Sequence, residues 1–255
     1  MDSLSLFLKL FLGTVMYRPY VYGFFICFLF FAGRQLGWRS LLTFTFLAYG
    51  MAYACEYSAT RNGFPFGVYT YLDGTRTREL WISNIPFWDS LSFVFLSYFS
   101  WIMASSLRCP PYPSRALLEW PTALLSGLLM MLLDVVIDPL TLLGDRWFLG
   151  KIYFYPQGGS YFGVTILNFL GWFFVGTITV FAFQRVALRQ NLKWSPITGP
   201  TSWGVFGVYA GVFLFNWGVT AWIGEWSLFT ASGLVIFVTL LPCAWILIRR
   251  APVLA

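Results

Sequence analysis

The sequence predicts an all-α fold: a polytopic transmembrane helix bundle of about seven spans, forming one integral membrane domain over residues 1–255. Hydrophobic residues make up 58% of the chain and charged residues only 10%, whereas soluble domains carry about 25% charged residues. Apolar runs long enough to cross a bilayer recur along the whole chain. The net charge of +6 is therefore interpreted as a signal of topology and of anionic lipid, since no basic tract is dense enough to bind nucleic acid.

Short polar or proline-rich stretches separate the apolar runs. The predicted spans are residues 17–36, 40–57, 85–107, 116–137, 161–184, 203–223 and 228–248. Arg18 and Arg34 lie at the two ends of the first span, and we expect both to snorkel toward the interface. The preceding apolar stretch, residues 4–15, is too short to cross the bilayer. It either lies at the interface as an amphipathic helix or extends the first span.

The charges orient this bundle if consecutive connections alternate between its two sides. One side then collects nine Lys and Arg residues against a single acid, Glu119, and the other collects seven against nine acids. Lys and Arg favour the cytoplasmic side, so we expect the first side, which includes the C-terminus, to be cytoplasmic. Its basic residues are Arg34, Arg39, Arg108, Arg115, Arg185, Arg189, Lys193, Arg249 and Arg250.

Two carboxylates stand near the end of the fourth run, in the segment LLMMLLDVVIDP. Asp134 and Asp138 are four residues apart, so a helix places them on one face, one turn from each other. Pro139 is expected to end that helix, because the residue before a proline is disfavoured in the α region. An ionisable pair near the hydrocarbon is costly and indicates a functional site. The alternative is that the pair caps a helix end and meets the interface.

Further polar residues are expected at the same end of the bundle. Glu56, Asp89 and Glu225 fall near this end in the alternating topology, and an aromatic loop follows the Asp pair. Asn168 is expected about two turns into the fifth run, and Asn216 lies in the sixth. Together these residues predict the rim and wall of one pocket. The alternative is that acids simply prefer helix ends, because the membrane centre is expensive for them.

The residue types exclude several kinds of chemistry. The chain has no histidine, so a histidine-ligated iron, histidine-box or haem site lacks its ligands. The four cysteines have no CxxC spacing, and neither a GxGxxG nor a P-loop motif is present. We therefore expect no metal and no cofactor. The remaining candidates for chemistry are carboxylates, hydroxyls, amides and aromatic faces.

Four segments carry a resemblance to a known family. They are Glu56 with the following NGFPFGVYTY, the Ile85-Pro86 pair with Trp101, LLDVVIDP at 132–139, and GSYFGVTILNFLGW at 159–172. The last of these is the most specific. In these segments the chain resembles the bacterial and archaeal carotenoid hydratase family, which includes γ-carotene 1′-hydroxylase-like and bisanhydrobacterioruberin hydratase-like membrane proteins. The resemblance covers roughly residues 52–174.

The resemblance implies addition of water across the terminal C=C of an acyclic carotenoid end group, without metal or redox cofactor. A carboxylic acid would protonate the alkene, water would capture the tertiary carbocation, and a second carboxylate would accept the surplus proton. Asp134 or Asp138 is the expected donor and Glu56 or Asp89 the expected base. Asn168 is expected to hold the water or the donor carboxyl.

Aromatic side chains near the loops are expected to line the substrate site together with Asn216, because aromatic faces stabilise cations by ~0.5–2 kcal/mol each. The expected partners are a hydrophobic polyene drawn from a bacterial or archaeal cell membrane, water and lipid. The oligomeric state stays open. The aromatic candidates are Tyr69, Trp147, Tyr153, Tyr155, Tyr161, Phe162 and Trp172.

Other functions remain open. Proton-initiated cyclisation of a carotenoid or isoprenoid end group begins with the same cation and differs only in how it is captured. An isoprenoid transferase would bind Mg²⁺-diphosphate and needs two Asp-rich motifs, whereas this chain has one. A retinal-type receptor needs a mid-membrane lysine, but the lysines are Lys9, Lys151 and Lys193, all outside the spans. A non-enzymatic lipid or isoprenoid transporter would be expected to contain repeats, and none is visible.

Overall fold

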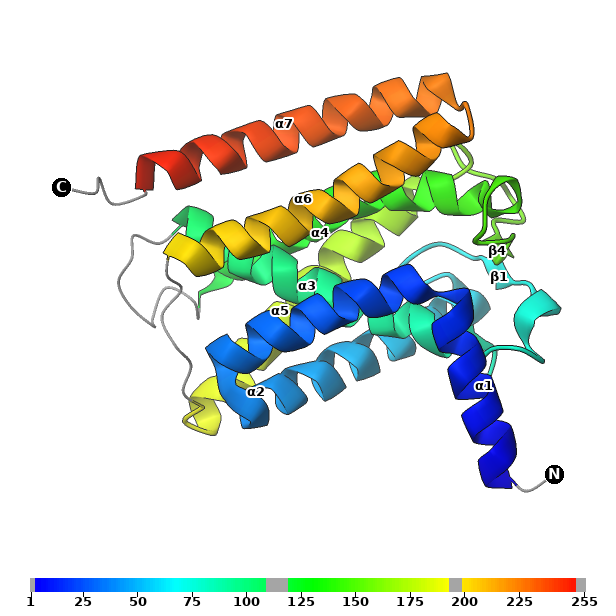
Figure 1. Ribbon diagram of the computed structural model, residues 1–255, viewed down its shortest axis with the longest axis horizontal. Coiled ribbons are helices and arrows are strands. Elements are labelled where there is room, and N and C mark those ends of the chain that lie inside the picture. Colours follow the sequence, from blue (N-terminus) through cyan, green and yellow to red (C-terminus); the bar gives the residue numbers. More distant parts are fainter. Residues whose placement is uncertain (1–2, 109–118, 193–198, 251–255) are drawn as a thin grey trace.

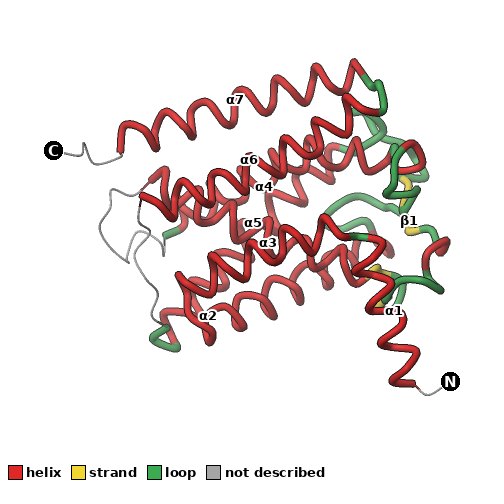
Figure 2. Tube along the Cα trace, viewed as in Figure 1, coloured by secondary structure: helices red, strands yellow, loops and turns green. Residues whose placement is uncertain are grey.

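The computed structural model describes residues 3–108, 119–192 and 199–250. The long helices run side by side along the longest axis, and the first helix leaves the bundle at an angle (Figure 1). Loops and two-residue strands gather at one end (Figure 2). The helices are α1 (Ser3–Tyr17), α2 (Pro19–Asn62), α3 (Phe87–Arg108), α4 (Trp120–Leu142), α5 (Ile166–Arg189), α6 (Gly199–Trp222) and α7 (Trp226–Arg250).

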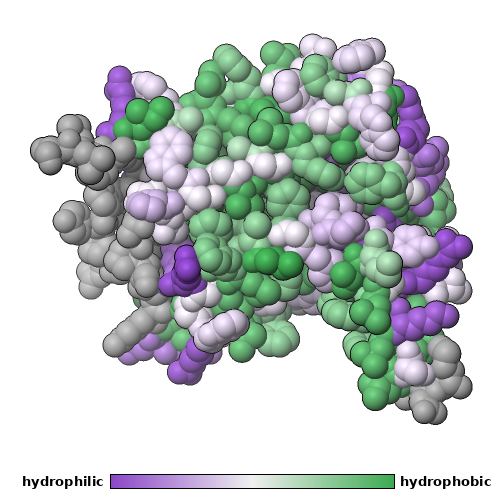
Figure 3. Space-filling view, viewed as in Figure 1, coloured by the Kyte–Doolittle hydropathy of each residue, from purple (hydrophilic) through white to green (hydrophobic). Residues whose placement is uncertain are grey.

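Six helices in the described part of the chain, α2 to α7, are long and apolar enough to cross a membrane. On the face shown in Figure 3, apolar side chains cover the middle and hydrophilic side chains gather toward the two ends. This distribution is the one that a bilayer requires of a helix bundle. The all-α fold class is confirmed, and the chain is a multi-pass integral membrane protein.

Helix α2 folds back on itself at Gly37. This residue has φ 71° and ψ 164°, a conformation open essentially to glycine alone. The rings of Phe28 and Phe44 lie 6.2 Å apart across the two halves, although a straight helix would separate them by about 24 Å. The halves, residues 19–36 and 38–62, correspond to the first two predicted spans. Counted separately, they bring the long apolar segments among the described residues to seven, the predicted number.

Two helix boundaries were wrongly predicted. Helix α4 continues past Pro139 to Leu142, because a proline in the last turn removes only the hydrogen bond to Val135 and leaves the rest of the turn in place. Helix α5 begins at Ile166, so Asn168 lies in its first turn and not two turns inside.

The late start of α5 has a local cause. Tyr161 and Val164 exchange backbone hydrogen bonds of 3.1 and 2.9 Å. Phe162 and Gly163 between them have φ values of 48° and 86°, outside the helical region. The helix can therefore begin only after this turn, where the Thr165 hydroxyl accepts a bond from the backbone N–H of Asn168 at 3.3 Å and caps the first turn.

Two loops distant in the sequence join at the end of the bundle that carries the polar residues. Strand β1 (Thr70–Tyr71) pairs antiparallel with β4 (Tyr153–Phe154), and β2 (Trp81–Ile82) pairs with β3 (Ile85–Pro86). The 3₁₀ helices η1 (Asp73–Thr75) and η3 (Gly144–Arg146) lie in the same two loops. Behind them, α3 is the central helix, and 89% of its most apolar stretch is buried inside the protein.

Arg18 does not snorkel as expected, whereas Arg34 is exposed and stacks on Phe30. The Arg18 side chain is fully buried, with Nε and Nη2 donating to Glu79 at 2.9 and 2.7 Å. Nη1 donates to the backbone oxygen of Leu149 at 2.5 Å. The guanidinium therefore binds a buried acid in place of water. Through Glu79 and Leu149, Arg18 connects the α2–α3 loop and the α4–α5 loop to the start of α2.

The break at Arg18 separates α1 from the first span. Arg18 has φ −126° and ψ 48°, so the apolar N-terminal stretch does not extend that span. Thr14 Oγ1 accepts a hydrogen bond of 2.8 Å from the backbone N–H of Leu80, and this contact attaches α1 to the loop end. Leu4, Leu12 and Met16 remain exposed.

Consecutive helix ends alternate between the two ends of the bundle, as the charge count assumed (Figure 1). The turn between the two halves of α2 and the end of α7 lie at the end opposite the strands (Figure 1). Of the basic residues in the charge count, Arg115 and Lys193 lie outside the described residues. Cytoplasmic exposure of the C-terminal end stays a prediction.

Candidate active site

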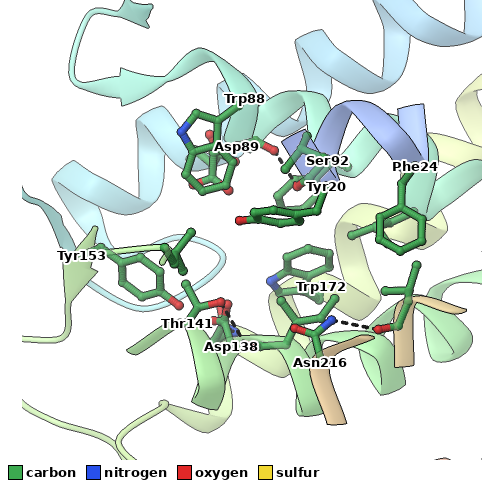
Figure 4. A pocket seen from close by; sticks show the side chains of 18 of the residues that line it. Tyr20, Phe24, Trp88, Asp89, Ser92, Asp138, Thr141, Tyr153, Trp172 and Asn216 are labelled. Carbon is green, nitrogen blue, oxygen red and sulfur yellow. Dashed lines mark hydrogen bonds between the residues drawn. The ribbon is translucent and has the colours of Figure 1, made fainter. Parts of the chain in front are cut away.

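A pocket lies between the helices at the loop end, with about 870 Å³ of empty space including its open mouth. Tyr20, Trp88 and Asp89 border one side of the space and Asp138 and Asn216 the other (Figure 4). Of the candidates named from the sequence, those that line the pocket are Glu56, Tyr69, Asp89, Asp138, Trp147, Tyr153, Tyr155, Asn168, Trp172 and Asn216.

One amide joins the two aspartates of α4. Asn168 Nδ2 donates to Asp134 Oδ2 at 2.6 Å and to Asp138 Oδ2 at 2.7 Å. The two carboxyl groups also lie within hydrogen-bonding reach of each other. Asp138 faces the pocket, whereas Asp134 is fully buried behind it. The three side chains form one cluster, which we call the Asp–Asn cluster.

Close packing of α4 against α5 makes this contact possible, because Asn168 has a short side chain. A Cβ on Gly176 would lie 2.8 Å from Met130 Sδ, and one on Gly127 would clash with the backbone of Phe173. Small residues that allow two backbones to approach are typical of helix contacts in membranes. The glycines along these two helices thus set the distance across which the amide reaches both aspartates.

A second acidic cluster comes from α2 and α3. Glu56 is buried, and its Oε2 accepts a hydrogen bond of 2.7 Å from Ser90 Oγ. Its Oε1 has no hydrogen-bond partner among the described residues. Asp89, in the first turn of α3, accepts a hydrogen bond from the Tyr71 hydroxyl. Both carboxyl groups line the pocket, so four acids from three helices meet at one level.

The β1–β4 pair brings four tyrosines together over the loop end of the pocket. Tyr69, Tyr71, Tyr153 and Tyr155 are all buried, and their neighbouring rings lie 5.2 to 6.1 Å apart. Burial, and secondarily the nearby Asp138, raises the pKa of Tyr153 well above its usual value. The pKa of Tyr155 is raised by the same two causes. These hydroxyls therefore stay neutral donors.

Sequence reasoning missed Tyr71 and Ser90, the direct partners of the second acidic cluster. The signal for Tyr71 was available, because Tyr69 and Tyr71 in the segment YTY are two residues apart and a strand places both on one face. Ser90 carried no comparable signal, since a serine in an apolar helix usually bonds to its own backbone. Tyr20 and Trp88 line the pocket as well and were also missed.

Three other candidates lie away from the pocket wall. Tyr161 packs against Phe162 and Phe169, with ring centroids 4.9 and 5.6 Å apart, and neither Tyr161 nor Phe162 lines the pocket. Glu225 pairs with Arg146 near the surface. The turn that delays the start of α5 removes the first two from the span in which they were expected.

The fold and the pocket define a class: a multi-pass membrane protein with an acidic, aromatic-lined pocket at one end of its helix bundle. The chain belongs to the carotenoid biosynthesis protein family, whose model matches residues 8–240. It is similar to the bisanhydrobacterioruberin hydratase of Haloarcula japonica, with 29% identity over 231 residues that cover 86% of this chain and 70% of the relative. No solved structure matches the chain significantly.

Proposed function

We propose that this protein adds water across the terminal C=C of an acyclic carotenoid end group, without a cofactor. The observation that carries the proposal is the Asp–Asn cluster, in which one amide binds two buried carboxyl groups at a pocket wall. Membership of a carotenoid biosynthesis family supports the substrate class. The name of the Haloarcula japonica relative supports hydration as the reaction.

The Asp–Asn cluster is suited to deliver a proton. Two carboxylates in contact inside a buried site repel each other, which favours the state in which they share one proton. Asp138 faces the pocket and is the proposed donor. Its O–H bond breaks as the proton passes to the alkene carbon, and the positive charge is left on the neighbouring carbon that bears two methyl groups. Asp134 and Asn168 position the donor carboxyl.

The second acidic cluster is suited to direct water. Glu56 Oε1 has no partner among the described residues, so this oxygen is free to accept a hydrogen bond from a water molecule. The water oxygen forms a bond to the cationic carbon, and Glu56 or Asp89 takes the released proton. One proton enters and one leaves, so the reaction adds water with no net change in oxidation state.

The aromatic lining supports the cationic intermediate. Trp172, stacked on Phe93 at a centroid distance of 4.1 Å, and the four tyrosines place π faces around the pocket. Each face within reach would stabilise the cation by ~0.5–2 kcal/mol. The tyrosine hydroxyls stay protonated because burial raises their pKa, so they do not trap the cation as phenolates.

The test is expression of the chain in a bacterium that accumulates lycopene, followed by mass analysis of the extracted pigments. Hydration predicts products heavier by one or two waters than the starting pigment. Cyclisation, the second candidate, would change the chromatographic retention and leave the mass unchanged. An unaltered pigment profile with lycopene and with other acyclic carotenoids would contradict both functions and would favour a transport role.

A further inference from the structure

The pocket has an apolar limb that the proposed chemistry does not use. It extends from the acids along α2, α3 and α6, and its side chains carry no group able to transfer a proton. Its walls are built by Val21, Phe24, Phe95, Leu96, Val212 and Phe215.

On one side, between α2 and α6, aromatic rings cover this limb. Tyr20 and Phe24 on α2 and Phe215 on α6 line the pocket and are only partly buried. Tyr20 stacks on Phe215 with centroids 5.2 Å apart, and Phe24 meets the same ring at 6.3 Å. Phe148, which is 53% exposed, packs on Tyr20 and Phe215 from outside. The wall of the pocket between α2 and α6 is thus built from aromatic side chains.

Helix α6 meets the first half of α2 through a glycine-rich face, which we call the α2–α6 seam. A Cβ on Gly204 would lie 2.6 Å from the Phe31 ring, so the helices touch at the end away from the acids. Beside the pocket the packing loosens, because a Cβ on Gly211 would lie 3.9 Å from the Phe24 ring. The residues that share this face of α6, spaced three or four apart, are Gly204, Gly207, Gly211, Phe215 and Gly218.

Elsewhere around the pocket the elements are well packed. Helix α3 is central and buried, α4 and α5 are packed closely at Gly127 and Gly176, and the four tyrosines cover the loop end. A linear carotenoid is far longer than its end group. With the end group beside Asp138, the rest of the chain has to leave through a wall, and lipid is the medium in which it dissolves.

We propose that the α2–α6 seam is a lateral portal: the polyene chain lies in the apolar limb and passes between Phe24 and Phe215 into the bilayer. The identity of this occupant rests on the proposed function. The seam then selects long linear chains, because a chain can thread a narrow apolar gap that a bulky cyclic end group cannot enter. The rings of Tyr20 and Phe215 separate to admit the chain and close on it.

The test is the substitution Gly211→Phe, which places a ring in the seam opposite Phe24. The matched control is Gly50→Phe, since Gly50 is a helical glycine in the second half of α2, with no atom within 4 Å of its added Cβ. Each variant is produced in lycopene-accumulating cells and purified in detergent, and the bound lycopene is measured by visible absorbance per protein. We expect Gly211→Phe to retain about tenfold less lycopene, equivalent to ~1.4 kcal/mol, and Gly50→Phe to match the wild type.

A second substitution covers the case in which Gly211→Phe does not accumulate in membranes. Phe215→Ala removes the ring that closes the seam, and we expect bound lycopene to wash out several-fold faster. Unchanged retention in Gly211→Phe, or unchanged wash-out in Phe215→Ala, would overturn the portal. If the wild-type protein binds lycopene without hydrating it, and the two variants bind or retain less lycopene, the proposed function fails and the portal stands. If Gly211→Phe binds and hydrates lycopene normally, the portal fails and the function stands.

Discussion

Asn168 on α5 donates a hydrogen bond of 2.7 Å to Asp138 on α4, across a separation of 30 residues in the sequence. The contact holds the carboxyl at the pocket wall in one orientation. The same amide binds Asp134 through its second N–H, so the three groups act as a unit. A general acid needs such a fixed position, because proton transfer depends on geometry before it depends on acidity.

Replacing Asp138 by Asn should abolish most hydration. The change keeps the size of the side chain and removes the transferable proton, and general acid catalysis contributes ~10²–10⁴-fold in rate. Hydroxylated carotenoid formed per amount of protein in isolated membranes is the measurement. Asp145→Asn, at an exposed acid on the same loop end, is the matched control and should retain full activity. Full activity in Asp138→Asn would remove Asp138 from the proton-donor role.

Replacing Tyr71 by Phe should slow the reaction without unfolding the protein. The change deletes the hydroxyl that donates to Asp89 and keeps the ring in the four-tyrosine group. A hydrogen bond to a charged group is worth ~1.5–3 kcal/mol, so the rate should fall by at least about tenfold. Tyr57→Phe, at a residue that is 41% exposed, serves as control. A rate equal to that of the control would show that Asp89 needs no positioning.

The Arg18–Glu79 pair should be a main determinant of stability. Both side chains are fully buried, and removing one partner of such a pair leaves an uncompensated charge at a cost of ~3–5 kcal/mol. Arg18→Met should therefore lower the melting temperature in detergent strongly, and the double variant Arg18→Met with Glu79→Leu should recover most of the loss. The exposed pair Arg76–Asp73 offers the control Arg76→Met, with little effect. Equal melting temperatures for Arg18→Met and Arg76→Met would contradict this role.

Much of the fold was predictable because a bilayer imposes simple rules on sequence. The length needed to cross a bilayer and the scarcity of charged residues within a span located the long segments, including the two halves of α2. The alternation of helix direction then placed Glu56, Asp89 and the Asp pair at one end. Those rules depend only on transfer free energies. The sequence therefore predicted that Glu56, Asp89, Asp134 and Asp138 meet at one level, but it also included Glu225, which pairs with Arg146 away from the pocket.

The errors came from contacts that are not local in the sequence. The burial of Arg18 depends on Glu79, 61 residues away, and no hydropathy rule anticipates that partner. The two misplaced helix ends had local causes instead: the last turn of α4 tolerates Pro139, and the turn at Phe162 delays the start of α5. The contact of Asn168 with both aspartates could not be predicted, because it depends on the short distance between α4 and α5, which their glycines determine.

The orientation of the bundle is open to a reporter test. The positive-inside rule, applied to the Lys and Arg count, predicts that the end of α7 is cytoplasmic, which puts the pocket near the opposite face of the membrane. A green fluorescent protein fused after residue 255 should therefore fluoresce, and an alkaline phosphatase fused there should be inactive. The reverse pattern would invert the topology and leave the site unchanged.

Isotope labelling of the product is the most direct test of proton-initiated hydration. The purified protein is incubated with lycopene in D₂O enriched in heavy oxygen, and the product is analysed by mass spectrometry and NMR. For each reacted end group we predict one carbon-bound deuterium and one heavy hydroxyl oxygen on the adjacent carbon, with both lost in Asp138→Asn. A product whose oxygen comes from dissolved O₂, or one that carries deuterium without oxygen, would contradict hydration.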